Sequence, residues 1–271
     1  MNISGYLFLA ILAMGSCNRG YGAGIAGSRG GANTLQFKAV YGVGMRFKRR
    51  FFFCAIGLLL LLSACSQTFD WHQRIRIVVM TPKGEVAAET VQAIEAVYFP
   101  KWQQIGGYER NYSMRGEAVA ADLGDGQYLF VLLADEMLAE RVLPVDRSHA
   151  NKPGYLRDIE NLEGAGPVEI QPERRPRLVS FDDISDPKSL RLVDPNNLAA
   201  AFGPGFALQS MTLEITADPI TFGQIEAVLG GNFFRRWAAD HQAALKRGIS
   251  DPYFETSSSK MSRGNFIRGD L

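Results

Sequence analysis

The sequence predicts an α+β fold for residues 65–271, with antiparallel strands dominating the first half of this region and short helices the second. Two patterns carry this prediction. Runs of β-branched residues with alternating polarity, separated by turn residues, gather before residue 135. Helical periods with capping signals appear after that point, chiefly beyond residue 194.

The first strand signal is residues 74–80 (RIRIVVM), which lead into the turn residues Thr81-Pro82-Lys83-Gly84. The next run, residues 84–99, fits two structures. Its Ala and Glu content and its apolar spacing fit a helix, whereas its place after a turn and its Val-Tyr-Phe ending fit the second strand of a hairpin. We favour the strand.

A second hairpin is predicted around Gly124-Asp125-Gly126, because strand-like residues 117–123 and 128–134 flank this turn signal. The later run begins Tyr-Leu-Phe-Val-Leu-Leu, which is typical of a central strand covered on both faces. Residues 136–141 are a candidate short helix. Prolines and glycines then become more frequent, so residues 144–176 are expected to be mainly loop.

The remaining residues complete the α+β pattern. Asp194 followed by Pro195 predicts an N-cap and the first position of a helix that ends at Phe202. We further expect a short tether at residues 66–72, strands at residues 177–181 and 206–216, helices at residues 221–229 and 233–246, and a mobile, polar C-terminal tail at residues 257–271.

An export signal begins at Met45 (MRFKRRFFFCAIGLLLLLSACSQ). Basic residues precede a twelve-residue apolar run, Phe51 to Leu62, as in secretory signals. A helix of twelve residues is about 18 Å long, which is too short to cross a hydrocarbon core of about 30 Å.

The end of the run, Leu62-Ser63-Ala64-Cys65, resembles the lipobox of bacterial lipoproteins at every position. The resemblance implies cleavage between Ala64 and Cys65, and acylation of Cys65 as the lipid attachment site. Two or three acyl chains give a lasting bilayer anchor. The residue after the cysteine is Ser66 rather than Asp, which by the same resemblance implies the outer membrane. The alternative is a buried helix that happens to end in cysteine.

Residues 1–44 are expected to be an upstream extension from a misassigned start, with Met45 as the true start. They are glycine-rich, and no acidic residue occurs before Asp70. A rival signal at residues 3–14 has no basic residue before it. Residues 22–27 fit G-x-G-x-x-G, but no strand precedes them, so we reject a dinucleotide site. The predicted organisation is therefore extension (1–44), signal peptide (45–64) and a single mature domain (65–271).

Charge and cysteine content exclude several classes of protein for the mature domain. The chain has 29 basic residues, of which seven precede Ser66, leaving 22 against 28 acidic residues. A net charge near −6 argues against nucleic-acid binding. Cys17 and Cys54 leave with the leader and Cys65 is the anchor, so neither a disulfide nor a thiolate zinc site is expected.

No residue is assigned to catalysis, to a metal or to a cofactor. The common serine and zinc hydrolase motifs are absent from the sequence. His149, in a loop with Asp146 and Ser148, is the one histidine that we retain for an alternative hydrolase site. The paired acids Asp135-Glu136 and Asp182-Asp183 are expected in turns and caps.

Two basic clusters are candidate contact surfaces. Glu173-Arg174-Arg175-Pro176-Arg177 could meet lipid phosphate or an acidic partner, or form a solvated loop. Phe233-Phe234-Arg235-Arg236-Trp237 is typical of an interfacial patch, but packing of a helix explains its aromatic residues equally well.

Three stretches resemble a family of uncharacterised proteobacterial proteins. They are Trp71-His-Gln-Arg-Ile with its Thr81-to-Gly84 turn, Gly116-Glu117-Ala-Val, and Val193-Asp-Pro-Asn-Asn-Leu-Ala-Ala-Ala-Phe-Gly-Pro-Gly205. The resemblance implies no activity and no site residues. We therefore expect a non-catalytic, periplasm-facing lipoprotein for binding or envelope maintenance. Its partners would be the bilayer, through Cys65, and an envelope protein or small molecule. The alternative is an envelope hydrolase.

Overall fold

The computed structural model describes residues 66–104 and 109–269. The chain divides into two units, residues 1–53 and 54–271, and every described residue belongs to the second. Its strands are β1 (Gln67–Thr81), β2 (Gly84–Tyr98), β3 (Arg110–Glu117), β4 (Val119–Gly124), β5 (Gln127–Val131), β6 (Val168–Glu169), β7 (Leu178–Phe181), β8 (Leu190–Val193), β9 (Ala207–Thr216) and β10 (Ile267–Arg268). Its α-helices are α3 (Leu138–Val142), α4 (Gly154–Glu160), α5 (Ala199–Phe202), α6 (Gln224–Leu229) and α7 (Phe233–Arg247).

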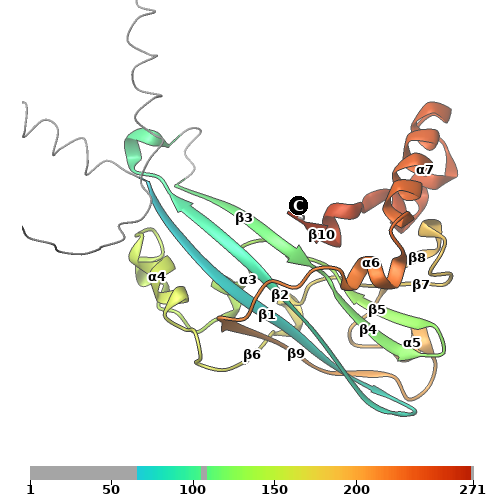
Figure 1. Cartoon of the computed structure of the whole chain (residues 1–271), viewed down its shortest axis with the longest axis horizontal. Coiled ribbons are helices and arrows are strands. Elements are labelled where there is room, and N and C mark those ends of the chain that lie inside the picture. Colours follow the sequence, from blue (N-terminus) through green and yellow to red (C-terminus); the bar gives the residue numbers. More distant parts are fainter. Residues whose placement is uncertain (1–65, 105–108, 270–271) are drawn as a thin grey trace, which may run out of the picture. The chain divides into compact units, whose positions relative to one another are not determined.

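The strands form two antiparallel sheets, which confirms the predicted α+β class (Figure 1). The large sheet has the order β10-β3-β2-β1-β9-β6, and the small sheet has the order β4-β5-β7-β8. Strands dominate the first half of the described residues, and most of the helices lie in the second half.

The centre of the large sheet is the long hairpin of β1 and β2, which pair from Gln67–Tyr98 to Thr81–Gly84. Odd-numbered residues of β1, such as Ile75 and Ile77, face the core, and even-numbered residues face solvent. The hairpin confirms the strand assignment for residues 84–99. The tether expected at residues 66–72 is wrong, because β1 begins at Gln67 and buries Phe69 and Trp71.

The β4–β5 hairpin turns at Asp125 and Gly126, both of which have positive φ, as a type I′ turn requires. The preceding strands β3 and β4 are separated only by Ala118, where the chain passes from the large sheet to the small one. Gly116 permits this passage: its φ is +135°, and a Cβ there would lie 3.0 Å from the Cα of Gln92.

The fully buried Glu117 fastens α6 beside this bend. Its carboxylate accepts hydrogen bonds from the backbone N–H groups of Gln224 (2.8 Å) and Ile225 (3.2 Å), in the first turn of the helix. Burial raises the pKa of Glu117, and the bonds from α6 offset part of that rise.

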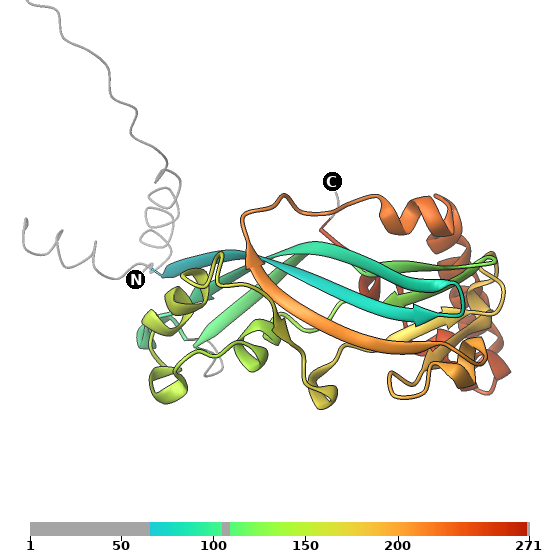
Figure 2. The ribbon, with the colours of Figure 1, turned by 90° about the horizontal axis from the view of Figure 1, so that it is seen from below.

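The small sheet lies between two hydrophobic cores. Leu129 and Val131 of β5 point into a core shared with the large sheet, whereas Phe130 and Leu132 point into a second core. The second core holds Phe233 and Trp237 of α7, together with residues from α6 and the C-terminal segment. This arrangement confirms that β5 is covered on both faces. Figure 2 shows α6 and α7 (orange to red) at one end of the body and α4 (yellow-green) at the other.

Residues 257–269 pack onto the body, so the mobile tail expected from sequence is wrong for these residues. Met261 and Phe266 enter the second core, and Ile267 begins β10, which pairs with β3. Sequence did not reveal the three large apolar side chains that anchor this otherwise polar segment. Apolar residues spaced along short 3₁₀ turns give no regular hydrophobic period.

Two other expectations differ from the structure. The helix expected from Asp194 is shorter, since Asp194 Oδ1 accepts from Asn196 N (2.9 Å) in a turn and α5 begins only at Ala199. The loop expected at residues 144–176 contains α4, whose Leu156 and Ile159 are buried against β1.

Candidate functional site

His149 is held by two carboxylates. Its Nε2 lies 2.8 Å from Asp158 Oδ2 and its Nδ1 lies 3.6 Å from Asp146 Oδ2. The Ser148 hydroxyl donates to Asp146 (2.9 Å) rather than to the imidazole. A nucleophilic triad needs the reverse order, with histidine between hydroxyl and carboxylate. The local arrangement of these residues is therefore a capped turn.

A buried carboxylate, Glu140, lies in the same region. It forms an ion pair with Arg110 (2.9 Å) and accepts a short hydrogen bond from the Tyr112 hydroxyl. Burial, and then the hydrogen bond and charge of Glu140, raise the pKa of Tyr112. Because both partners come from β3, these contacts dock α3 on the large sheet.

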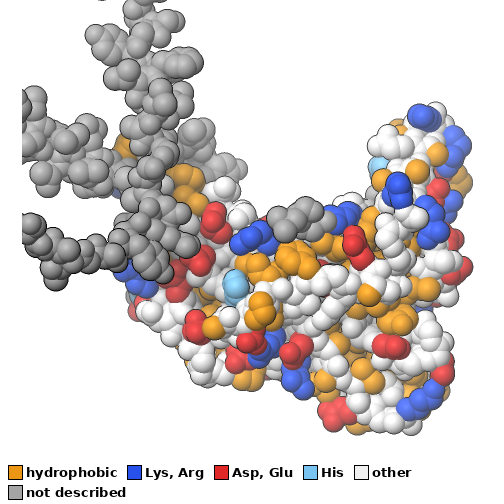
Figure 3. All heavy atoms as spheres, viewed as in Figure 1, with side chains coloured by type: hydrophobic (Ala, Val, Ile, Leu, Met, Phe, Trp, Pro, Cys, Tyr) orange, Lys and Arg blue, Asp and Glu red, His pale blue; other side chains and the backbone are white. Residues whose placement is uncertain are grey.

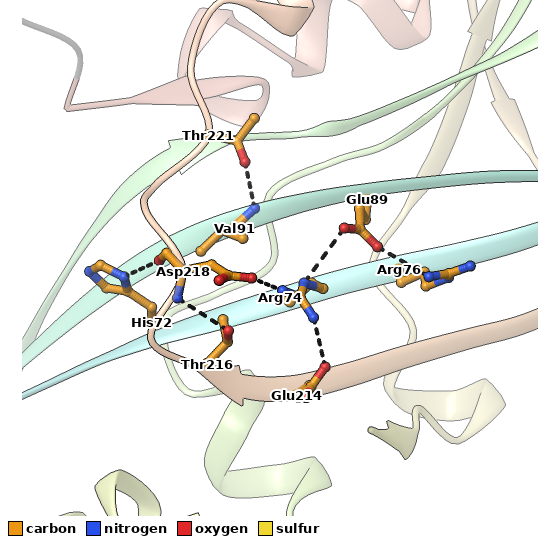
Figure 4. A network of polar contacts seen from close by, with 9 residues as sticks. All are labelled: His72, Arg74, Arg76, Glu89, Val91, Glu214, Thr216, Asp218 and Thr221. Atoms are coloured by element: carbon orange, nitrogen blue, oxygen red, sulfur yellow. Dashed lines mark hydrogen bonds and ion pairs between the residues drawn. The ribbon is translucent and has the colours of Figure 1, made fainter. Parts of the chain in front are cut away.

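A second charged cluster lies on the solvent face of the large sheet (Figure 4). Arg74 of β1 is surrounded by Glu89 of β2 (3.6 Å), Glu214 of β9 (3.0 Å) and Asp218. Asp218 belongs to the segment that leaves β9, and its backbone oxygen lies 2.6 Å from His72 Nδ1. We call these residues the Arg74 cluster.

The Arg74 cluster holds that segment across the sheet. Further along it, Thr221 exchanges hydrogen bonds with the free edge of β2, donating N–H to Val91 O (2.9 Å) and accepting from Val91 N (3.0 Å). The single positive charge of Arg74 thus has three carboxylates nearby, and these ion pairs join β1, β2 and β9 to the segment that follows β9.

The basic cluster at residues 173–177 lines a cavity of about 580 Å³, which we call the arginine groove. Its floor is the extension of β5, where Leu132 N donates to Arg177 O (3.0 Å) and Leu133 N donates to Asn265 O (2.9 Å). The charged lining residues are four arginines, Arg141, Arg174, Arg175 and Arg177, and two acids, Asp135 and Glu173.

Two of the four arginines are neutralised. Arg141 pairs with Asp135 (2.6 Å), and Arg175 turns back to pair with Glu169 (3.2 Å). Burial alone would raise the pKa of Asp135, but the hydrogen bond and charge of Arg141 outweigh it and lower the pKa. The Asp135 carboxylate is therefore favoured in its ionised form, in which it pairs with Arg141.

The other two arginines have no such partner in the part of the chain that the structure describes. Within the described residues, no carboxylate lies within 4.0 Å of the guanidinium nitrogens of Arg174 or Arg177. Arg174 ends the 3₁₀ helix η3 (Pro172–Arg174) and Arg177 immediately precedes β7, so backbone structure holds both at the groove. Free guanidinium groups on a concave wall are suited to phosphate or carboxylate.

A second cavity, of about 430 Å³, lies on α7 and is lined by Phe234, Trp237, Met261 and polar neighbours. The aromatic residues of the predicted interfacial patch are mainly packing residues, because Phe233 and Trp237 are buried in the second core. The arginines of α7 remain on the surface, and Figure 3 shows Lys and Arg side chains gathered around this helix.

The other candidates from sequence are separate from the groove. Cys65 and the cleavage site lie outside the described residues. His241 contacts the rings of Tyr253 and Phe254, and Asp183 accepts from Ser185 N in a turn, as expected. Sequence missed Arg141 and Asp135 as neighbours of residues 173–177, since only the tertiary fold brings them together.

Within residues 66–104 and 109–269, no group of three His, Cys, Asp or Glu side chains is placed to hold a metal ion. No helix in that part of the chain is both long and apolar enough to cross a membrane. No protein-family model, curated protein or solved structure matches the chain.

Proposed function

We propose that the protein is a lipid-anchored envelope lipoprotein whose body binds an anionic ligand in the arginine groove. The observation that carries the binding role is the pair Arg174 and Arg177, which line a 580 Å³ cavity with no carboxylate partner among the described residues. Uncompensated guanidinium groups favour a ligand that brings its own phosphate or carboxylate oxygens.

The anchor is acylated Cys65, after cleavage between Ala64 and Cys65, with the body on the periplasmic face of the outer membrane. The basic n-region, the short apolar run and the lipobox support this assignment. The bilayer is then one partner, and the ligand of the groove, a small molecule or an acidic segment of an envelope protein, is the other.

The geometry favours binding over hydrolysis. His149 has a carboxylate at each ring nitrogen, and the hydroxyl of Ser148 is directed at Asp146. Because no serine, threonine or cysteine among the described residues hydrogen-bonds to the His149 ring, this histidine gives the alternative hydrolase no support. The groove itself contains neither histidine nor a hydroxyl side chain.

The anchor is tested by the intact mass and N-terminal peptide of the membrane-extracted protein, with Cys65→Ala as control. We expect a chain that begins at a triacylated Cys65, and no acylated product from the variant. An unmodified chain that begins at Met1 or at Ser66 would overturn the lipoprotein assignment.

The groove is tested by calorimetric titration of the full chain, in neutral detergent, with inorganic pyrophosphate and with citrate. We expect the double variant Arg174→Ala/Arg177→Ala to bind the preferred anion at least about tenfold more weakly, since each charge-assisted hydrogen bond contributes roughly 1.5–3 kcal/mol. Arg76→Ala is the matched control, because Arg76 is an exposed arginine on the solvent face of the other sheet. Equal affinity in wild type and double variant, or no binding of either anion, would overturn the groove as the site.

A further inference from the structure

The end of the body nearest to Cys65 carries an exposed tryptophan. Trp102 is 66% exposed, whereas the other two tryptophans of the chain, Trp71 and Trp237, are each 3% exposed. It lies in the 3₁₀ helix η1 (Lys101–Gln103), which the chain enters directly after leaving β2. Such exposure costs free energy, because the indole ring remains in water.

The fold holds Trp102 close to the anchor position. Cys65 is two residues from Gln67, and Gln67 pairs with Tyr98 at the end of the hairpin. Four further residues lead from Tyr98 to Trp102. Even if every connecting residue were fully extended, Trp102 would lie at most about 27 Å from Cys65. Both views show η1 and the start of β1 at the same end of the molecule, opposite α7 (Figures 1 and 2).

Trp102 has the chemistry of a bilayer interface residue. Tryptophan concentrates at the headgroup level, where its ring meets acyl chains and its N–H meets water. Lys101, next to it, is exposed and can approach lipid phosphate. Lys152 is exposed at the same end, where Asn151 O accepts a hydrogen bond from the Tyr98 hydroxyl (3.0 Å). Carboxylates such as Asp70 also lie there, so the tryptophan rather than net charge carries the contact.

We infer that Trp102 is a membrane-contact residue, which enters the headgroup layer of the bilayer that holds acylated Cys65. This inference rests on the proposed anchor and adds a defined orientation to it. One flexible attachment point leaves a body free to tilt, whereas a second contact fixes which end meets the bilayer. The distal end, with α7, then faces away from the membrane.

The experiment uses the full acylated chain in vesicles of phosphatidylethanolamine and phosphatidylglycerol, with or without brominated acyl chains, which quench tryptophan by contact. We expect lower tryptophan emission in the brominated vesicles, because Trp102 would lie against the acyl chains. Trp71 and Trp237 are buried in the protein, so they should not contribute to the difference. Trp102→Phe should abolish the difference between the two vesicle types. Ile249→Ser, which removes an exposed apolar residue that follows α7, is the matched control and should leave the quenching unchanged.

The outcomes separate the two proposals. Acylated protein that floats with the vesicles but shows equal emission in both vesicle types would overturn the membrane contact and leave the anchor standing. A mass without acyl groups on Cys65 would overturn both. Quenching that persists in Trp102→Phe would also overturn the contact, because another tryptophan would then be the one that meets lipid.

Discussion

Two groups of arginines in this protein differ in what surrounds them. Arg74, at the centre of the large sheet, faces Glu89, Glu214 and Asp218, and its side chain is 23% exposed. In the arginine groove, Arg174 and Arg177 face a cavity and have no carboxylate within 4.0 Å among the described residues. Arg74 therefore has three carboxylates for one positive charge, whereas Arg174 and Arg177 have no carboxylate partner among the described residues.

Under the proposed function, this difference separates arginines that stabilise the fold from arginines that are available to a ligand. The charges around Arg74 join three strands and the segment after β9, so they are used up within the fold. In the groove, Arg141 and Arg175 are paired with carboxylates, whereas Arg174 and Arg177 have no ion pair among the described residues and are the two that the proposed ligand would bind. Uncompensated positive charge on a concave surface is the more informative signal, because folding alone gives no reason to keep it.

The largest expected effect is on stability. Arg74→Met would leave three carboxylates facing one another, and we expect a loss of about 2 kcal/mol in the free energy of unfolding, between the values for exposed and buried pairs. Arg177→Met should change it by less than about 0.5 kcal/mol. Urea unfolding measures both. Equal losses of unfolding free energy in the two variants would contradict the distinction between the Arg74 cluster and the arginine groove.

A smaller effect is expected on ligand affinity. Asp135→Asn releases Arg141 from its carboxylate and adds a free guanidinium to the groove, so we expect citrate or pyrophosphate to bind about threefold more tightly, as for one exposed charge. Asp125→Asn is the control, because Asp125 also pairs with a basic side chain, that of Lys83 (2.7 Å), but neither residue lines the groove. A weaker anion affinity in Asp135→Asn, measured by the same calorimetric titration, would mean that Asp135 positions the ligand through Arg141.

The smallest effect is a pH dependence. The pKa of Asp135 is lowered in the folded protein, so its contribution to stability is present above the unfolded value of about 3.8 and is lost as the pH falls through the lowered value. Since Asp135 is half-exposed, we expect only about 0.5 kcal/mol. Urea midpoints of wild type and Asp135→Asn between pH 2.5 and 5 measure it. A gap between the two proteins that widens towards low pH would contradict the assigned sign.

Local signals predicted the parts of the fold whose causes are local. Gly124-Asp125-Gly126 identifies its hairpin because a type I′ turn needs residues that tolerate positive φ. β3 was missed, since residues 110–117 have little apolar alternation and are held by pairing with β2. The helix α4 was missed because it is only seven residues long and has just three apolar core residues, Tyr155, Leu156 and Ile159, in a proline- and glycine-rich stretch.

The candidate site divides in the same way. Residues 173–177 are visible in sequence as a basic cluster, but a solvated loop has the same composition. What distinguishes a groove is the floor at Leu132 and Leu133 and the approach of Arg141, and those contacts join residues more than 30 positions apart. Sequence could find the charges, and only the fold shows which of them are neutralised.

In the proposed anchored protein, the hairpin of β1 and β2 would also act as a spacer. Fifteen paired residues in each strand span about 50 Å at roughly 3.4 Å per residue. If the end at Gln67 rests on the bilayer, the Pro82-Lys83 turn reaches across a distance comparable to the diameter of a small protein. Because a paired hairpin is stiffer than a flexible linker of the same length, a chain anchored at Cys65 as proposed would keep the Pro82-Lys83 turn at a fixed distance from its anchored end.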